Sequence, residues 1–279
     1  MYPDITIFGK TFGIYALIAV AAGMLVGVLM CRRVSRLGLD DNDAIMFLLC
    51  VVGGVLVGGS VLYALTNLQF VPRLFASGSF GEFINNFNLL FGGSVFYGGL
   101  LGGSLTGWLY TKYKHLDKTV YLDTIAPLIP LFHGFARIGC FFGGCCYGIE
   151  SHIGFVVHNN PYIPALNGVR RFPVQLLESA GEFAIFMILQ ILYSKIWRNK
   201  PKSDDDSPAQ KMRGRLLPLY LILYPILRFF DEFLRGDEIR GFVFNGLLST
   251  SQFISIILFI VGIIWLVVSR PKKVDSASA

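Results

Sequence analysis

The segment "HGFARIGCFFGGCCYG" (residues 133–148) places a histidine, an arginine and three of the chain's five cysteines within and just after an apolar stretch. His133, Arg137 and Cys140 follow one another at i, i+4 and i+7, so a helix would carry them on one face. The paired glycines predict the end of that helix, and the last two cysteines then lie in the following turn. Ionisable groups at membrane depth usually face a polar cavity, so this segment indicates a buried polar site.

The composition is that of an integral membrane protein. Of the 279 residues, 54% are hydrophobic and 15% are charged, whereas about 25% are charged in soluble domains. Several apolar stretches reach the roughly 20 residues that a helix needs to cross a bilayer. The expected fold class is therefore all-α, with about seven transmembrane helices, at residues 12–31, 43–66, 93–111, 119–142, 173–194, 216–234 and 249–269.

Lysine and arginine gather in alternate connections between these expected helices, which predicts the orientation. Basic turns follow the first and third helices, and more basic residues occupy 195–215 and the C-terminal tail. We therefore expect the N-terminus outside and the C-terminus in the cytoplasm. The net charge of +6 is then a topology signal, and no nucleic-acid partner is expected. The chain is expected to form one polytopic domain, 1–279, with a charged cytoplasmic linker at 198–215.

Two arginines, Arg137 and Arg228, fall inside apolar stretches. An unpaired charge at that depth costs at least about 2.5–3.5 kcal/mol, so both need partners. Glu232 lies four residues after Arg228, on the same face of a helix. These groups could form salt bridges that only hold the helices together. A ligand site is the favoured interpretation, and a phospholipid head group suits it because arginine binds phosphate through a planar fork of donors.

The cysteines have several possible uses. Cys140 could form a disulfide with Cys145 or Cys146, or one thiolate beside Arg137 could be reactive. Small cysteines that simply pack are the plainest interpretation. No metal is expected, because C-x4-C-C is not a standard zinc spacing, and no other cofactor motif occurs.

Four motifs follow one another along the chain: Y-G-G-L-L-G (97–102), D-x-I-A-P-L-I-P with R-I-G (123–139), R-x-P-x-Q-L-x-E (171–178) and R-F-x-x-E-F-x-R (228–235). In this order the chain resembles the prolipoprotein diacylglyceryl transferase family over most of its length. The resemblance implies a multi-pass enzyme of the bacterial plasma (inner) membrane with its active site towards the outer side. Such an enzyme moves a diacylglyceryl group from phosphatidylglycerol to a lipobox cysteine of a prolipoprotein and releases glycerol phosphate.

The resemblance also implies roles for residues. Arg137 and Arg228 would hold the lipid phosphate, Glu232 would orient Arg228, and Gln175 with Glu178 would shape the cavity. The expected catalytic residues are His133, Arg137, Cys140, Cys145, Arg228, Glu232 and Tyr97. The expected substrate-binding residues are Gly98, Gly99, Arg171, Gln175, Glu178 and Arg235.

The chain departs from the family pattern at several of these positions. Tyr97 stands where the family has a histidine, Cys140 replaces an asparagine, and Cys145 replaces an acidic residue. Phe12 stands for a tyrosine of the first helix. The base that deprotonates the acceptor thiol is therefore open between His133 and a cysteine thiolate. Two alternatives follow: a transferase with another lipid or small-molecule acceptor, and a non-enzymatic lipid-binding or transport protein.

Overall fold

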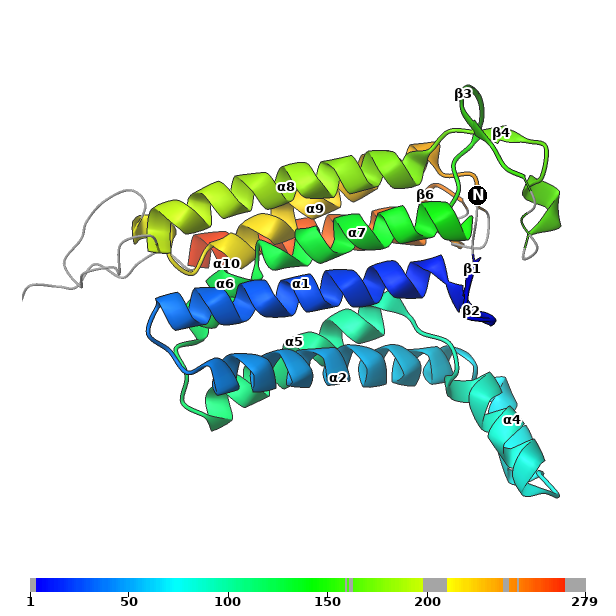
Figure 1. The fold of residues 1–279 in the computed structure, drawn as a ribbon, viewed down its shortest axis with the longest axis horizontal. Coiled ribbons are helices and arrows are strands. Elements are labelled where there is room, and N and C mark those ends of the chain that lie inside the picture. Colours follow the sequence, from blue (N-terminus) through cyan, green and yellow to red (C-terminus); the bar gives the residue numbers. More distant parts are fainter. Residues whose placement is uncertain are drawn as a thin grey trace, which may run out of the picture. The chain divides into compact units, whose positions relative to one another are not determined.

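The computed structural model describes residues 4–158, 160, 163–197, 210–237, 241–244 and 246–268. Helices dominate it (Figure 1). The α-helices are α1 (Ile14–Arg36), α2 (Asp41–Thr66), α3 (Val71–Phe75), α4 (Phe80–Phe91), α5 (Phe96–Tyr113), α6 (Lys118–Ile125), α7 (Leu128–Gly143), α8 (Val174–Trp197), α9 (Leu216–Asp231) and α10 (Thr250–Val268).

Short elements complete the described chain. The 3-10 helices are η1 (Leu68–Phe70), η2 (Pro164–Leu166), η3 (Gln210–Met212) and η4 (Glu232–Leu234). Three small antiparallel pairs join β1 (Asp4–Ile7) with β2 (Lys10–Gly13), β3 (Glu150–Val156) with β4 (Arg170–Arg171), and β5 (Phe242–Val243) with β6 (Leu248–Ser249).

The helices agree with the all-α membrane class. Each of the seven expected stretches is largely helical, and five helical segments in the described chain are long and apolar enough to cross a membrane: Ile14–Arg36, Asp41–Thr66, Lys118–Gly143, Val174–Trp197 and Thr250–Val268. The number seven and the orientation stay predictions. The first helix begins two residues later than expected, because residues up to Gly13 pair in β2. The segment expected at 119–142 divides into α6 and α7 around Pro127, whose ring removes a helical donor.

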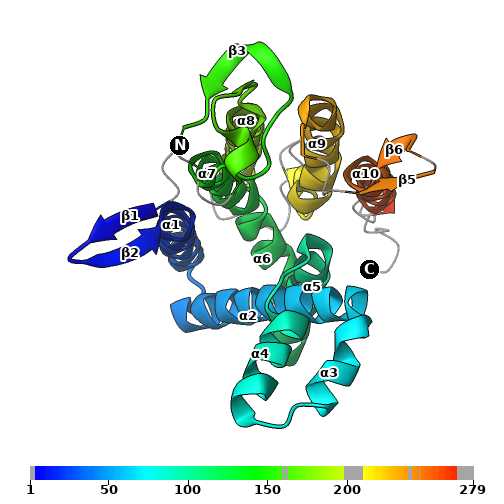
Figure 2. The same ribbon diagram turned by 90° about the vertical axis from the view of Figure 1, so that its right-hand side faces the viewer.

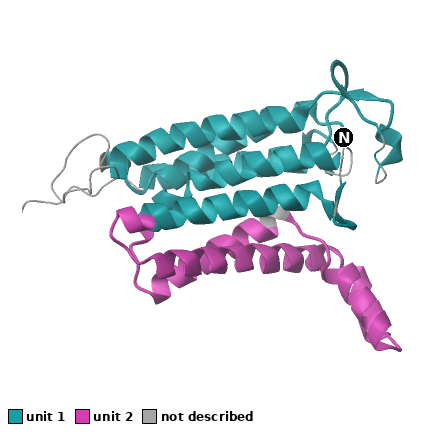
Figure 3. Cartoon of the chain, viewed as in Figure 1, with its two compact units in different colours: residues 1–33, 119–279 teal, residues 34–118 magenta. Residues whose placement is uncertain are grey.

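The chain divides into two compact units (Figure 3): residues 1–33 with 119–279, and residues 34–118. That the chain is one polytopic domain stays a prediction. Most of the expected linker, residues 198–209, lies outside the described residues.

In the unit of residues 34–118, helices α2 and α5 pack backbone against backbone. A Cβ atom at Gly98 would lie 2.2 Å from the carbonyl oxygen of Gly58, and one at Gly102 would lie 2.1 Å from that of Gly54. Small residues allow this close approach in membrane helices. The glycine-rich motif at 97–102 therefore has a packing role in this contact.

In the other unit, α7, α8, α9 and α10 lie side by side (Figure 2), with α7 on α8, α8 on α9 and α9 on α10. Small residues bring α7 and α8 together, since the Ser179 hydroxyl donates to the carbonyl of Gly134 at 2.8 Å. Asp123 of α6 accepts from the backbone amides of Gly214 and Leu216, at 2.7 and 3.3 Å, and so fixes the start of α9. These contacts set the helices that carry the charged site.

Candidate active site

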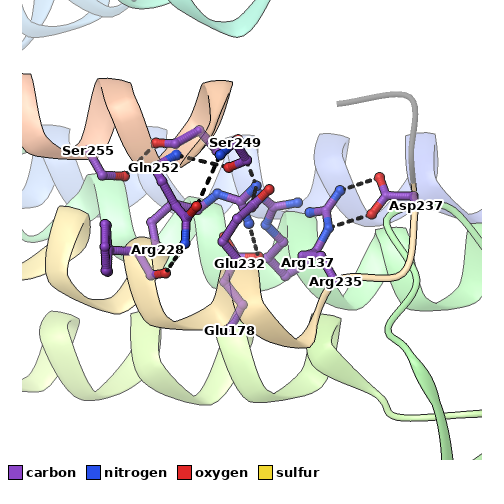
Figure 4. Close-up of polar contacts among 11 residues, drawn as sticks. Arg137, Glu178, Arg228, Glu232, Arg235, Asp237, Ser249, Gln252 and Ser255 are labelled. Atoms are coloured by element: carbon purple, nitrogen blue, oxygen red, sulfur yellow. Dashed lines mark hydrogen bonds and ion pairs between the residues drawn. The ribbon is translucent and has the colours of Figure 1, made fainter. Parts of the chain in front are cut away.

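The centre of the site is Glu178 on α8, a carboxylate that is 1% exposed. Its Oε1 lies 3.0 Å from Nη2 of Arg137 on α7, and its Oε2 lies 3.5 Å from Nη1 of Arg228 on α9 (Figure 4). One carboxylate therefore bridges two arginines from two neighbouring helices. The expectation that these arginines find buried partners is confirmed.

Arg228 has two further partners beyond α8. Its Nη2 lies 2.7 Å from Oε2 of Glu232, the i+4 pair predicted from the sequence, and donates to the Ser251 hydroxyl at 3.1 Å. Ser251 is held at the start of α10 by a reciprocal cap, in which Ser249 and Gln252 each accept from the other's backbone amide (Figure 4). The guanidinium is thus fixed from α8, η4 and α10.

His133 lies one turn before Arg137 on the same face of α7, as its spacing predicts. Its Nδ1 is 2.6 Å from Oε1 of Glu182, which is fully buried one turn after Glu178 on α8. The ring of Tyr224 on α9 meets the imidazole edge to face, with centroids 5.1 Å apart. The carboxylate fixes the orientation of the histidine, as a hydrogen-bonded acid does in many catalytic pairs.

The charges of the central network balance. Arg137 and Arg228 supply two positive charges, and Glu178 and Glu232 supply two negative ones. The Nε–H of Arg137 is buried and has no hydrogen-bond partner among the described residues. A buried donor without a partner is costly, so this group is suited to receive an acceptor oxygen from a ligand.

The three cysteines after Arg137 meet at the end of α7. Gly144 adopts φ +71° and Cys146 φ +56°, so the chain turns back over the helix end. The thiol sulfurs of Cys140, Cys145 and Cys146 then lie within 4.8 Å of one another. All are free thiols, so the disulfide considered from the sequence is not formed in this structure.

The cysteine turn is held by neighbours on three sides. The Gln175 amide donates to the carbonyl of Cys145 at 2.8 Å, and the backbone amide of Gly236 donates to the carbonyl of Tyr147 at 2.9 Å. Arg171 donates to the carbonyl of Gly148 at 3.2 Å and covers the Tyr147 ring at 4.7 Å. Gln175 and Arg171, both expected to bind substrate, therefore support this turn.

The thiols outside the helix differ in acidity. Hydrogen bonds from Cys140 and Cys145, together with the charges of Arg235 and Arg137, lower the pKa of Cys146 below its ordinary value. Hydrogen bonds to Cys140 and Cys146 raise the pKa of Cys145. Arg235 in turn holds Asp237 with two hydrogen bonds, the one from its Nε at 2.7 Å (Figure 4).

Three further expected residues belong to the unit of residues 34–118. Gly98 and Gly99 lie on α5 in the unit of residues 34–118 and pack against α2. Tyr97 is the second residue of the same helix, and its side chain is outside the described part. His152 and His158, in β3 and shortly after it, are exposed.

Tyr15 of α1 joins the site although the sequence did not indicate it. Phe12, matched to the family's tyrosine, lies in β2 and is exposed. Three residues later, the Tyr15 ring packs so closely on α7 that a Cβ at Gly139 would lie 2.9 Å from it. Its hydroxyl interacts electrostatically with Cys140, Cys145 and Arg137. Had the first helix been aligned with the family pattern three residues later, Tyr15 would have matched the family's tyrosine.

Within the described residues, five helical segments are long and apolar enough to cross a membrane, and paired arginines and carboxylates form a buried set. These features define the class: a multi-pass membrane protein with a charged site between its helices. Residues 5–268 match the family model described as prolipoprotein diacylglyceryl transferase. The chain belongs to the prolipoprotein diacylglyceryl transferase family.

Individual relatives agree with the family match. The phosphatidylglycerol–prolipoprotein diacylglyceryl transferase of Clostridium tetani is 34% identical over 275 residues, which cover 96% of this chain and 97% of the relative. Transferase 2 of Clostridium perfringens is 34% identical over 95% of this chain and 96% of its own length. The Clostridioides difficile protein of the same name is 30% identical over 98% of this chain and 97% of its own.

Proposed function

We propose that this protein transfers a diacylglyceryl group from phosphatidylglycerol to the lipobox cysteine of a prolipoprotein. Family membership and the names of the relatives support the reaction. The single structural observation that carries it is the pair of buried arginines bridged by Glu178. The enzyme works in the bacterial plasma membrane with its site towards the outer side, which the distribution of lysine and arginine supports.

Arg137 and Arg228 bind the phosphate of the donor lipid. A phosphodiester carries one negative charge, and the glycerol phosphate that leaves carries nearly two at neutral pH. Guanidinium groups that are already in position before the reaction stabilise this growing negative charge. Their effect is largest where water is excluded. The Nε–H of Arg137, which lacks a partner among the described residues, contacts a phosphate oxygen directly.

Glu178 and Glu232 position the two arginines. Two guanidinium groups repel each other at close range, and the bridging carboxylate offsets this repulsion. Glu232 and Ser251 fix the other edge of Arg228. These contacts orient both guanidinium groups before the lipid binds.

The transfer breaks a carbon–oxygen bond and forms a carbon–sulfur bond. The acceptor sulfur attacks the glyceryl carbon, the phosphate oxygen leaves with the bonding electrons, and the thiol proton must be removed. Two groups near Arg137 are the candidates to promote the loss of this proton: the His133–Glu182 pair one turn before it, and the cysteine cluster at the end of the same helix. His133, Cys140 and Cys145 keep their proposed catalytic roles on this basis.

The test is transfer to a synthetic peptide. The purified chain is mixed in detergent with phosphatidylglycerol and a lipobox peptide, and the intact peptide mass is recorded. We expect one diacylglyceryl adduct on the cysteine and none on a matched peptide with serine in its place. A wild-type chain that leaves the cysteine peptide unmodified contradicts the proposal.

Arginine variants then test the phosphate site. Arg137→Lys and Arg228→Lys keep the charge but lose the fork, and we expect each to lower the transfer rate on the order of 10²-fold. Arg170→Lys is the matched control, because Arg170 is an exposed residue whose guanidinium donates only to the carbonyl of Gly154 among the described residues. Equal rates in all three variants would contradict the assignment of Arg137 and Arg228.

A further inference from the structure

The three cysteines at the end of α7 have the arrangement of a metal site. Their sulfurs all lie within 4.8 Å of one another. Sulfurs bound to one tetrahedral zinc ion, with zinc–sulfur bonds of about 2.3 Å, are about 3.8 Å apart. The largest separation therefore has to shorten by at most about 1 Å for all three sulfurs to bind one ion. The spacing C-x4-C-C did not predict this site. The three sulfurs come together because the chain turns back at the end of α7, and no standard zinc-binding spacing describes such a turn.

The backbone holds this turn ready. A Cβ atom at Gly148 would lie 2.3 Å from the carbonyl oxygen of Phe172, and one at Gly236 would lie 2.5 Å from that of Gly148. The turn is therefore pressed against the segments before α8 and after η4. Gln175 ties it to α8 through the carbonyl of Cys145. A ligand set fixed in this way loses little conformational entropy when it binds.

Charge and ligand type favour a soft cation. Three thiolates with one divalent ion carry a net charge of minus one, and this unit lies within electrostatic reach of Arg137 and Arg235. A guanidinium stabilises such an anionic unit, whereas it repels a hard cation bound by neutral carbonyls. Thiolates select zinc or copper(I) over magnesium or calcium.

The cluster is open on one side. Cys140 is buried, Cys146 is partly buried and Cys145 is exposed. Three protein ligands with one open position are the pattern of catalytic zinc sites, in contrast to the closed four-ligand pattern of structural ones. An incoming thiol is itself a fourth sulfur ligand. His133, by comparison, is largely buried and already paired with Glu182.

We propose that Cys140, Cys145 and Cys146 bind a zinc ion through three thiolates, and that the acceptor cysteine binds as the fourth ligand. The second part rests on the proposed function. A thiol that coordinates zinc loses its proton to solvent. The bound sulfur then donates an electron pair to the glyceryl carbon, the carbon–oxygen bond breaks towards the phosphate held at Arg137, and the thioether product leaves the metal. No oxidant or reductant takes part.

The first experiment measures metal binding by the full chain in detergent, with its thiols kept reduced by a phosphine. Cadmium serves as the probe, because thiolate–cadmium bonds absorb in the ultraviolet, and zinc is then used to displace it. We expect one ion per chain. Cys140→Ser and Cys146→Ser should each weaken binding by more than about 100-fold, since even loss of an outer-shell partner costs about 10–100-fold.

The matched control is the double variant Cys31→Ser/Cys50→Ser, which removes the two cysteines outside the cluster. It should bind the ion like the wild type and give the same absorption. Circular dichroism of each variant excludes loss of the fold as the cause of weak binding. Absence of cadmium binding to the wild type, or equal binding by a folded Cys140→Ser chain, overturns the proposal.

The second experiment measures whether an acceptor thiol binds at the open position of the metal, under conditions in which no transfer can occur. The lipobox peptide is added to the cadmium-loaded chain in the absence of phosphatidylglycerol. A fourth thiolate should raise the thiolate–cadmium absorption by about one third, and the serine peptide should leave it unchanged. Unchanged absorption with the cysteine peptide overturns the role in acceptor binding.

These readouts separate the two proposals. A chain that binds cadmium and the cysteine peptide but makes no lipid adduct supports the metal site and contradicts the proposed transfer. Full-rate formation of the adduct by the folded Cys140→Ser variant supports the transfer and contradicts the role of the cysteine cluster in binding the acceptor.

Discussion

The α2–α5 contact and the contact of α8 with α7 and α9 bring helices together in opposite ways. Between α2 and α5, glycines leave the backbones touching, with Gly98 against Gly58 and Gly102 against Gly54. On α8, a carboxylate holds one arginine from each neighbouring helix. The first contact gains packing at no electrostatic cost. The second buries several charged groups where a pair of apolar side chains would fit.

The difference indicates which contact serves function. Buried ion pairs stabilise a fold weakly, because removing the charges from water offsets most of their attraction. A chain that can join α2 and α5 with glycine has no structural need for charges on α8. The cost of burying the arginine–glutamate network supports the proposal that it serves a ligand, and substitutions should affect the two contacts differently.

The largest expected effect comes from Glu178→Ala. The change leaves the Arg137 and Arg228 side chains close together without their shared carboxylate. Removing one partner of a buried pair costs about 3–5 kcal/mol, so we expect that loss in the free energy of unfolding, measured by titration with a denaturing detergent. Transfer activity should be lost as well.

A double variant shows whether charge alone explains the loss. Glu178→Leu with Arg137→Met removes both charges and keeps the volume, which is often neutral or stabilising for a buried pair. We expect it to unfold near the wild-type denaturant concentration and yet to transfer nothing. Recovery of activity along with stability would mean that the network only holds the helices.

The middle effect tests the glycine contact. Gly102→Ala places a methyl group 2.1 Å from the backbone oxygen of Gly54, where no flexible side chain can yield. Overpacking of this kind costs about 1–3 kcal/mol. Gly53→Ala on α2 is the control, because a Cβ there meets nothing within 4 Å. The same unfolding titration should separate the two variants, and equal stabilities would contradict a packing role for the contact.

Local rules predicted much of this molecule. Each of the seven stretches predicted from apolar length is largely helical, although α3 and α4 lie outside them. The i+4 spacing of Arg228 and Glu232 predicted an ion pair that forms at 2.7 Å. The paired glycines predicted where α7 ends, and Gly144 indeed takes the left-handed conformation. Each of these features depends on residues within a few positions of one another, which is why the sequence was enough.

Contacts between distant segments were not predicted. Nothing local says that Glu178 will bridge two other helices, or that Glu182 will accept from His133. The meeting of the thiols depends on a positive φ at Cys146, which few non-glycine residues adopt. Tyr15 was not predicted because β2 extends to Gly13 and α1 begins only at Ile14. The alignment with the family's first helix was therefore wrong by about one helical turn.

The smallest expected effect comes from Ser251→Ala on α10. The change removes the hydroxyl that accepts from Nη2 of Arg228 at 3.1 Å, while Glu178 and Glu232 still hold the guanidinium. One hydrogen bond of this kind contributes about 0.5–1.5 kcal/mol. If it orients Arg228 for the lipid phosphate, the KM for phosphatidylglycerol should rise by up to about tenfold, and kcat should change less.

Ser255→Ala is the control for this substitution. Ser255 lies one turn further along α10 and bonds back to the carbonyl of Ser251 at 2.8 Å (Figure 4). Its loss removes a buried hydroxyl from the same helix without touching Arg228, so the KM should stay at the wild-type value. A KM that rises equally in both variants would show that α10 acts through its packing. A KM that rises only in Ser251→Ala would support a role of Ser251, the partner of Arg228 on α10, in the phosphate site.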